Sequence, residues 1–382
     1  MYMISAQDPS DTMNVFIRFI PEMNLMQERG FKAKYRFFFL RRCFMRVLLI
    51  GGTGTISMAI TRLLAEQGHE VCLLNRGNRN SDLPEGVKVL QCDICNEEAL
   101  NNLLTGMTFD AVGEFIGFVP EQAERDFHVF RGKTRQYLFI SSASAYQKPL
   151  ADPVITESTP LSNPYWEYSR NKIACEEFLM RQYRENGFPV TIIRPSNTYD
   201  ERSVPLGVHG KGGSWQVIKR MAEGKPVIIH GDGTSLWTIT HNSDFAKGYC
   251  GLIGNVHAIG QAFHITSDES LTWNQIYQII ADTLGVPLRA VHIPSDFLAS
   301  VSDYDLTGSL IGDKANSVIF DNSKLKRAVP GFTAEVRADQ GIRNTVQYIL
   351  SHPEYQIEDP EFDAWCDKVI SAYENLRGIL KV

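Results

Sequence analysis

The sequence lacks the hallmarks of a membrane protein and of a secreted scaffold. It contains no run of about 18 apolar residues, the length that a transmembrane helix needs. Its first residues show no basic patch followed by an apolar run and a small-residue cleavage site, so we expect no signal peptide. The seven cysteines are odd in number and scattered, unlike the paired cysteines of disulfide frameworks. We therefore expect a cytoplasmic protein with reduced thiols and no membrane partner.

An excess of basic charge is also missing. Lys and Arg total 38 against 44 Asp and Glu, a formal net charge of −6. Nucleic-acid binders are usually basic, so no nucleic-acid partner is expected. Cys92 and Cys95 form one Cys-x-x-Cys pair. A single pair cannot fill a four-ligand zinc site, so no metal site is predicted.

The chain has 382 residues, which at about 150 residues per domain indicates two or three domains. Residues 1–44 show no clean hydrophobic period, and an apolar strand pattern begins abruptly at Met45. We expect 1–44 to be an N-terminal extension, either disordered or upstream of a natural start at Met45. An added packed helix and an amphipathic membrane-surface segment are the alternatives.

Strand and helix patterns alternate from Met45 onward. Short apolar runs predict strands at 47–50, 71–74, 87–91, 111–115, 136–141 and 190–193, and longer patterns predict helices at 60–67 and 166–184. This alternation predicts an α/β fold, a Rossmann-type doubly wound parallel sheet with a smaller C-terminal α/β substrate-binding domain.

The predicted domains follow from where this alternation loosens. We assign residues 45–200, with about 236–258, to the nucleotide-binding domain, 201–235 and 259–350 to the substrate-binding domain, and 351–382 to a C-terminal helical tail. Helices are expected at 273–284, capped by Thr272, and at 338–350. The glycine-rich stretch 210–213 is predicted to be a mobile loop.

A glycine-rich turn follows the first predicted strand, reading Gly51-Gly52-Thr53-Gly54-Thr55-Ile56-Ser57. Glycine permits the positive φ of a tight turn and lets the backbone approach a phosphate. The N-terminus of the following helix offers free N–H groups to a pyrophosphate. We therefore predict cofactor contacts from Gly51, Gly54, Thr55, Ile56 and Ser57.

The ends of the second and third strands carry further predicted cofactor contacts. An acid usually ends the second strand and binds ribose hydroxyls. Here Asn75 and Arg76 stand there, with Arg79 nearby, so repulsion of a 2′-phosphate is absent and NADP is favoured over NAD. A solvated loop arginine is the alternative for Arg76. Asp93 and Ile94 are expected at the adenine, with a helix-start role as the alternative for Asp93.

Tyr168 and Lys172 lie four residues apart near the start of a predicted helix, which places them on one face. An ordinary tyrosine has a pKa near 10, but a nearby ammonium and an oxidised nicotinamide favour the phenolate. Lys172 can also hold the nicotinamide ribose. Ser142 follows a strand at its carboxyl end, where ligands bind in open α/β sheets. We predict Ser142, Tyr168 and Lys172 as the catalytic set, with Ser142 also contacting substrate.

The glycine turn, the serine and the Tyr-x-x-x-Lys helix, in this order, resemble the extended short-chain dehydrogenase/reductase superfamily. The resemblance is strongest to the NAD-dependent epimerase/dehydratase family, and it runs from Met45 to about Leu350. It implies that the catalytic set transfers a proton while the cofactor exchanges a hydride. It also implies a homodimer.

Two further segments look like elements of this family. Arg194-Pro195-Ser196-Asn197 resembles the segment beneath the nicotinamide, which implies a cofactor contact from Pro195 and a substrate contact from Asn197. His241-Asn242-Ser243-Asp244 resembles the element that returns the chain to the sheet.

Three departures from the family pattern affect the expected chemistry. Ser57 replaces a third glycine. Ala143 and Ser144 stand where the sugar-nucleotide 4,6-dehydratases carry an Asp-Glu pair, which disfavours elimination of water by that route. Trp237 stands where epimerases usually have an arginine for the substrate pyrophosphate, so a nucleoside-diphosphate sugar is disfavoured. Core packing is the default interpretation of Trp237, and a substrate contact in which it stacks on a ring is the alternative.

The predicted function is an NAD(P)-dependent oxidoreductase or epimerase acting on a sugar, a sugar nucleotide or a similar hydroxyl or carbonyl compound. Two alternatives remain open. One is an NADPH-dependent reductase of a small carbonyl compound. The other is a non-catalytic relative, since the chloroplast stem-loop RNA-binding proteins share a similar glycine turn.

Overall fold

The computed structural model describes residues 44–77 and 82–380. The N-terminal extension expected over residues 1–44 therefore lies outside the described residues, except for Phe44. Arg79, weighed above as a cofactor contact, also lies outside them. Within the described residues, no helix combines the length and the apolar character needed to cross a bilayer.

A seven-stranded parallel sheet organises the first part of the chain. In spatial order its strands are β12 (Gln261–Ile265), β7 (Val190–Pro195), β5 (Tyr137–Ile140), β4 (Ala111–Glu114), β1 (Arg46–Ile50), β2 (Glu70–Asn75) and β3 (Lys88–Gln91). Every neighbouring pair is parallel. The strand order reverses between β1 and β4, so the predicted doubly wound fold is confirmed and its ligand crevice is expected there.

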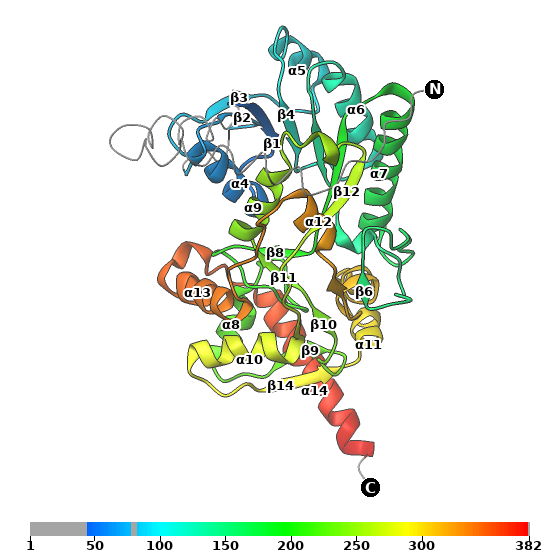
Figure 1. Cartoon of the computed structure of the whole chain (residues 1–382). Coiled ribbons are helices and arrows are strands. Elements are labelled where there is room, and N and C mark those ends of the chain that lie inside the picture. Colours follow the sequence, from blue (N-terminus) through cyan, green and yellow to red (C-terminus); the bar gives the residue numbers. More distant parts are fainter. Residues whose placement is uncertain (1–43, 78–81, 381–382) are drawn as a thin grey trace, which may run out of the picture. The chain divides into compact units, whose positions relative to one another are not determined.

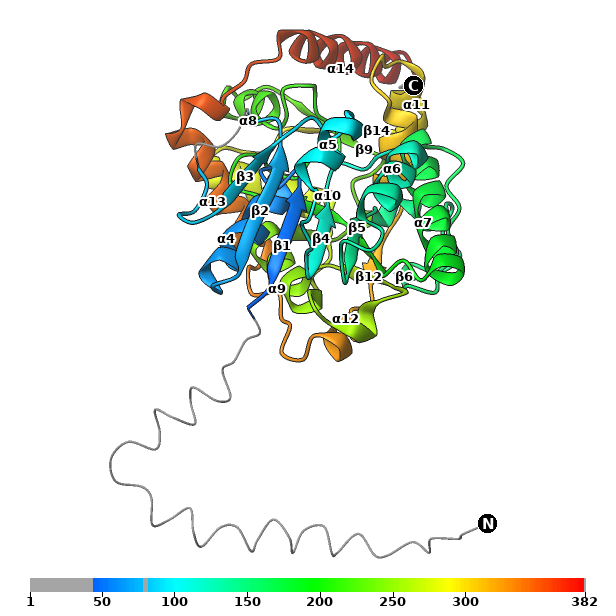
Figure 2. The same cartoon turned by 90° about the horizontal axis from the view of Figure 1, so that it is seen from above.

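Helices cover both faces of this sheet (Figures 1 and 2). One face carries α5 (Glu97–Leu103), α6 (Pro120–Phe130) and α7 (Glu167–Asn186); the other carries α4 (Thr55–Glu66), α9 (Asn242–Leu252) and α12 (Ser323–Ala328). Side chains alternate along a strand, so Leu48 and Ile50 pack on the first face while Val47 and Leu49 pack on the second. This double burial explains why β1 reads as an uninterrupted apolar run.

A second hydrophobic core is built mainly from residues after β7. Its short strands pair as β8 (Asn197–Tyr199) with β11 (Ile239–His241), β9 (Val227–His230) with β14 (Ala290–Ile293), β10 (Leu236–Trp237) with β13 (Leu271–Thr272), and β6 (Val154–Ile155) with β15 (Ile319–Phe320). Its helices are α8 (Trp215–Ala222), α10 (Trp273–Leu284), α11 (Ser295–Ser300), the π-helix η3 (Thr307–Lys314), α13 (Ala338–Ser351) and α14 (Pro360–Leu380). Short 3₁₀ turns complete the chain at η1 (Ala143–Ala145), η2 (Val256–Ala258) and η4 (Pro353–Tyr355).

The structure corrects the predicted domain boundary near residue 258. β12 was expected in the substrate-binding part, but it pairs with β7 and forms one edge of the seven-stranded sheet. Its Phe263 and Ile265 are buried on the face that carries α9. β12 belongs to the seven-stranded sheet because it pairs with β7, which is far away in the sequence. Local sequence patterns do not show which distant strands pair.

The predicted C-terminal tail is helical, and it is also part of the second core. On α14, Phe362, Cys366 and Ile370 are buried in that core. The stretch 210–213, predicted to be a mobile loop, packs against the start of this helix, where the Gly212 N–H donates to Asp359 Oδ2 at 3.2 Å. The apolar face of α14 therefore packs the tail into the second core, and Asp359, just before this helix, holds the loop.

Candidate active site

The glycine turn between β1 and α4 has room only for glycine at its first position. Gly51 has a φ of +79°, and a Cβ there would lie 2.6 Å from Ile116 Cγ2. Ser57, in place of the expected third glycine, closes the turn through its side chain. Its Oγ donates to the Gly51 carbonyl at 2.6 Å and accepts from the Gly54 N–H at 2.8 Å. The serine thus stabilises the tight turn without projecting into the crevice.

The first turn of α4 faces the main cavity. Thr55 and Ile56 line this cavity, and the first N–H groups of a helix have no intrahelical acceptor. Asn242 holds this turn by donating to the Thr55 carbonyl at 3.0 Å. Arg202, paired with Asp200, donates to Thr55 Oγ1 at 3.3 Å. Free amides, a helix N-terminus and a guanidinium together form a surface that suits a pyrophosphate.

The other predicted cofactor residues lie at the carboxyl ends of β2 and β3, outside the lining of this cavity. Asn75 Oδ1 accepts the Gly77 N–H at 2.8 Å. Arg76 is exposed, while Ile94 is buried beside the exposed Asp93. These positions follow the usual path of an adenosine along such a sheet edge.

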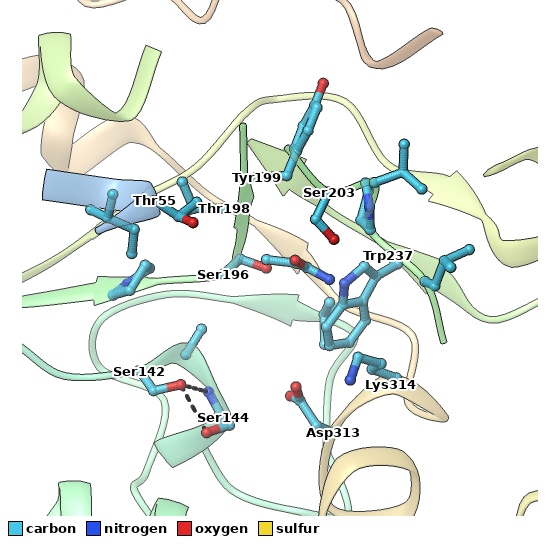
Figure 3. Close-up of a pocket in the computed structure, with 18 of the residues that line it drawn as sticks. Thr55, Ser142, Ser144, Ser196, Thr198, Tyr199, Ser203, Trp237, Asp313 and Lys314 are labelled. Atoms are coloured by element: carbon cyan, nitrogen blue, oxygen red, sulfur yellow. Dashed lines mark hydrogen bonds between the residues drawn. The ribbon is translucent and has the colours of Figure 1, made fainter. Parts of the chain in front are cut away.

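Ser142 lies two residues after β5 and caps the N-terminus of η1, where a short serine network holds its hydroxyl. Ser142 Oγ accepts the Ser144 N–H at 3.1 Å and lies 2.8 Å from Ser144 Oγ. Ser169 donates to Ser144 Oγ at 2.8 Å, so Ser144 has its own hydrogen left for Ser142. The hydroxyl hydrogen of Ser142 is therefore left for Tyr168, with which Ser142 forms a hydrogen bond, or for a ligand in the cavity that Ser142 lines (Figure 3).

Tyr168 and Lys172 are on α7, one helical turn apart. Tyr168 lines the same cavity as Ser142, and the Lys172 ammonium lies 5.7 Å from the centroid of the Tyr168 ring. Lys172 Nζ donates to the carbonyl oxygens of Gly117 and Ile140, each at 2.7 Å. An ammonium has three hydrogens, so one more remains for a ligand.

Burial shifts the pKa values of these two groups in opposite directions. It raises the pKa of Tyr168, an effect that a hydrogen bond from Ser142 opposes. Burial lowers the pKa of Lys172 to about 8, partly offset by Cys175 and Glu114. In both groups the neutral form is favoured because a low-dielectric surrounding penalises charge.

The cavity has a volume of about 560 Å³ and extends from Thr55 past Ser142 and Tyr168 into the second core. Pro195, Asn197 and Trp237, all predicted at the site, also line it. The structure therefore brings together the predicted catalytic serine and tyrosine and all three predicted substrate contacts.

Sequence reasoning missed a group of charged residues in the same cavity. Lys148, Asp313 and Lys314 line its wall on the side of the second core. Figure 3 shows the last two. Lys148 follows η1, whereas Asp313 and Lys314 end η3, so no local pattern connects them. Within the described residues no cluster of His, Cys, Asp or Glu is arranged to hold a metal.

The model of the NAD dependent epimerase/dehydratase family matches residues 47–266 of the chain. The match spans more than half of the sequence, so the chain belongs to this family, within the extended short-chain dehydrogenase/reductase superfamily. It is thus an enzyme of the NAD(P)-dependent oxidoreductase and epimerase class, as the resemblance predicted.

Two curated relatives illustrate the range of activities among similar chains. The 2'-dehydrokanamycin reductase of Streptomyces kanamyceticus is 26% identical over 75% of this chain and 80% of its own length. The chloroplast stem-loop binding protein of 41 kDa b of Arabidopsis thaliana is 24% identical over 63% of this chain and 64% of its own length.

A solved structure shows the same fold. The UDP-glucuronic acid 4-epimerase of Bacillus cereus, in complex with UDP-glucuronic acid and NAD, superposes with a TM-score of 0.65. It is 19% identical, and the alignment covers 80% of this chain and 99% of that one.

Proposed function

We propose that this chain transfers a hydride between a bound nicotinamide dinucleotide and a hydroxyl or carbonyl carbon of a sugar or sugar-like compound. The observation that carries this proposal is the convergence of Ser142 and Tyr168 on one cavity wall, with the Lys172 ammonium beside the tyrosine ring. All three residues stand at the carboxyl edge of the sheet, next to its switch point.

The cofactor, when bound, supplies the hydride acceptor or donor. Gly51, Gly54, Thr55, Ile56 and Ser57 form the turn that would hold its pyrophosphate. Support comes from the first-turn amides of α4 and from the Arg202 guanidinium at Thr55 Oγ1. The third hydrogen of Lys172 is available to a ribose hydroxyl.

Tyr168 moves the proton in this proposal. In the reducing direction its phenol donates a proton to the carbonyl oxygen, and in the oxidising direction its phenolate accepts the proton of the hydroxyl. Ser142 turns its hydroxyl hydrogen from Tyr168 to the same oxygen and orients it. Lys172 stabilises the phenolate by its charge, because an ammonium near a tyrosine favours the ionised form.

The choice between NAD and NADP depends on the end of β2. The exposed Arg76 and the missing carboxylate at Asn75 support NADP. The test is a parallel titration of the purified chain with NADH and NADPH, with Arg76→Ala as the variant and Arg62→Ala on α4 as the control.

We expect NADPH to bind more tightly than NADH, and Arg76→Ala to weaken NADPH alone. Tight NAD that copurifies with the protein would contradict the NADP preference and favour an epimerase, which returns the hydride to the same substrate. Failure to bind either dinucleotide would overturn the proposed function itself.

A second candidate is an NADPH-dependent reductase of a small carbonyl compound. Its support is the similarity to the 2'-dehydrokanamycin reductase and the presence of Trp237 where an arginine would bind a pyrophosphate. A reductase releases its oxidised cofactor after each turnover. Net consumption of NADPH with a carbonyl substrate therefore separates it from an epimerase.

RNA binding is the third candidate, supported by the similarity to the chloroplast stem-loop binding protein. The formal net charge of −6 and the presence of Tyr168 and Lys172 argue against it. Filter binding of structured RNA over a salt series tests it, since phosphate contacts give a steep salt dependence.

The resemblance also predicts a homodimer. Light scattering of the purified chain would measure its oligomeric state and so test this prediction.

A further inference from the structure

Three charged side chains line the cavity where it enters the second core. Lys148 is only 3% exposed, and Asp313 and Lys314 are partly buried beside it. Over residues 44–77 and 82–380, none of these three side chains forms a hydrogen bond or an ion pair within contact distance. Figure 3 shows Asp313 and Lys314 directed into the cavity near Trp237.

The backbone around these residues is held firmly. The carbonyl oxygen of Lys314 accepts from His230 Nε2 at 3.2 Å and Trp273 Nε1 at 3.0 Å. Asn163 donates to the carbonyls of Gly312 and Ser144, each at 2.7 Å, and so ties η3 to the Ser142 turn. These hydrogen bonds fix the backbone of η3 relative to the turn that carries Ser142.

Burying ionic groups without direct partners is unfavourable, and buried charges are normally paired or bound to an ion. Burial shifts all three groups toward their neutral forms, lowering the pKa of Lys148 and of Lys314 and raising that of Asp313. With all three ionised, the group carries two positive charges and one negative charge. An anion placed between the two ammonium groups would restore their ionic partners.

Trp237 adds an uncharged donor to the same wall. Its Nε1–H is buried and has no acceptor among the described residues, although its ring stacks on Trp273. An acceptor oxygen on a ligand would satisfy this group. Among the described residues, the two ammonium groups and the indole N–H therefore have no acceptor within hydrogen-bond distance, and Asp313 acts on the two lysines only through its charge.

We infer that Lys148, Lys314 and Trp237 form a subsite for an acidic group of the substrate, a carboxylate or a phosphate carried by a sugar-like compound. This inference rests on the proposed function, because the acidic group would anchor a substrate whose reacting carbon lies at Tyr168. Asp313 accepts a hydroxyl of the same substrate, and it lies close enough to Tyr168 to oppose its ionisation. The charge that the missing arginine at position 237 would supply is thus provided by Lys148, which follows η1, and by Lys314 at the end of η3.

The test measures sugar binding to the full chain saturated with whichever dinucleotide it binds. Glucuronate and glucose 6-phosphate represent the two acidic groups, glucose is the neutral reference, and glucosamine is the cationic one. Intrinsic tryptophan fluorescence and calorimetry report binding. The variants are Lys148→Gln and Lys314→Gln, with Lys368→Gln on the exposed side of α14 as the matched control.

We expect at least one acidic sugar to bind about tenfold or more tightly than glucose, the effect of gaining a charged hydrogen bond. Each lysine variant should lose most of that preference, and Lys368→Gln should keep it. Which acidic sugar binds better distinguishes a carboxylate from a phosphate. The comparison of acidic with neutral sugars uses the wild-type protein alone, so it remains informative even if a variant fails to fold.

Equal binding of acidic and neutral sugars, tighter binding of glucosamine, or no binding of any sugar would overturn the subsite. If the chain binds a dinucleotide but does not prefer acidic sugars, the subsite is contradicted and the proposed function is unaffected. If the chain prefers acidic sugars but binds no dinucleotide, the proposed function is contradicted and the subsite is supported.

Discussion

Tyr168 and Lys172 show how burial and charge act against each other on single residues. The tyrosine lies against Phe118 and Trp166, with ring centroids 6.5 Å and 4.9 Å away. This apolar surrounding raises the pKa of the phenol, so without further charge it remains protonated. The positive charge of an oxidised nicotinamide would oppose this effect of burial and favour the phenolate.

Replacing Tyr168 with Phe removes the proton donor and leaves the ring packing in place. We expect turnover with the best substrate from a sugar and carbonyl screen to fall by about 10²–10⁴-fold, the usual contribution of a general acid or base. Dinucleotide binding should be unchanged. Loss of NAD(P)H absorbance measures turnover. Full activity of Tyr168→Phe would contradict the assigned role.

Lys172 gives a predicted pH dependence for carbonyl reduction. Its pKa is lowered to about 8, so the ammonium is charged below this pH and loses its proton above it. We expect kcat/KM to fall as the pH rises through about 8, because the charge beside Tyr168 is then lost. Tyr168 itself titrates above its ordinary value and cannot produce this limb.

The comparison variant for this pH profile is Lys172→Met. It should be slower at every pH and should lack the alkaline limb. A limb that persists unchanged in Lys172→Met would show that another group causes it.

At the scale of elements, η3 packs the second core against the start of α7, the helix that carries Tyr168 and Lys172. A π-helix is rare and is frequent at functional sites. Here its glycines allow close packing: a Cβ on Gly308 would overlap the Trp166 ring, and one on Gly312 would lie 3.2 Å from Tyr165 Cβ. The closeness of this contact is what brings Asp313 and Lys314 to the cavity.

Replacing Gly308 with Ala should push η3 away from Trp166. We expect a loss of about 1–3 kcal/mol in the free energy of unfolding, the typical cost of overpacking. Weaker binding of substrate should accompany it, since the charged subsite moves with η3. Denaturant unfolding measures the first effect and KM the second.

The matched control for this experiment is Gly378→Ala on α14. No atom lies within 4 Å of a Cβ built there, so the substitution adds no clash. If Gly308→Ala proved as stable as Gly378→Ala, close packing at Gly308 would not be needed.

At the scale of the whole molecule, the second core depends on a contact between α8 and α14. Arg220 is fully buried and donates to the Pro226 carbonyl, to Asp363 Oδ1 and to Asp367 Oδ1, the last two at 2.7 Å. Asp363 and Asp367 are on α14, so ion pairs as well as apolar contacts join this helix to α8 and the second core.

Replacing Arg220 with Met retains much of the volume but removes the donors. We expect a loss of about 2–4 kcal/mol in the free energy of unfolding, the lower part of the range for broken buried ion pairs because Asp367 is half exposed. Lys326→Met, which breaks an exposed pair with Asp268, should change stability little. Equal effects of the two variants would contradict the structural role of Arg220.

Local sequence was sufficient to predict the elements that carry the catalytic set. The apolar run of β1, the glycine turn and the Thr272 cap depend on neighbouring residues, and each is found in the structure. The spacing of Tyr168 and Lys172 on one helix is likewise a local feature of the sequence. Periodicity and φ preference act over a few residues, so one sequence reveals them.

Tertiary structure alone decided the membership of β12, the docking of α14 and the meeting of Lys148 with Asp313 and Lys314. Each depends on groups far apart in the chain, and their contact is set by how the two cores pack. The sequence by itself determined the fold class and the places of the proposed catalytic side chains along the chain. What those side chains face was decided by long-range packing, because neither strand pairing nor charge clustering across a cavity leaves a local pattern.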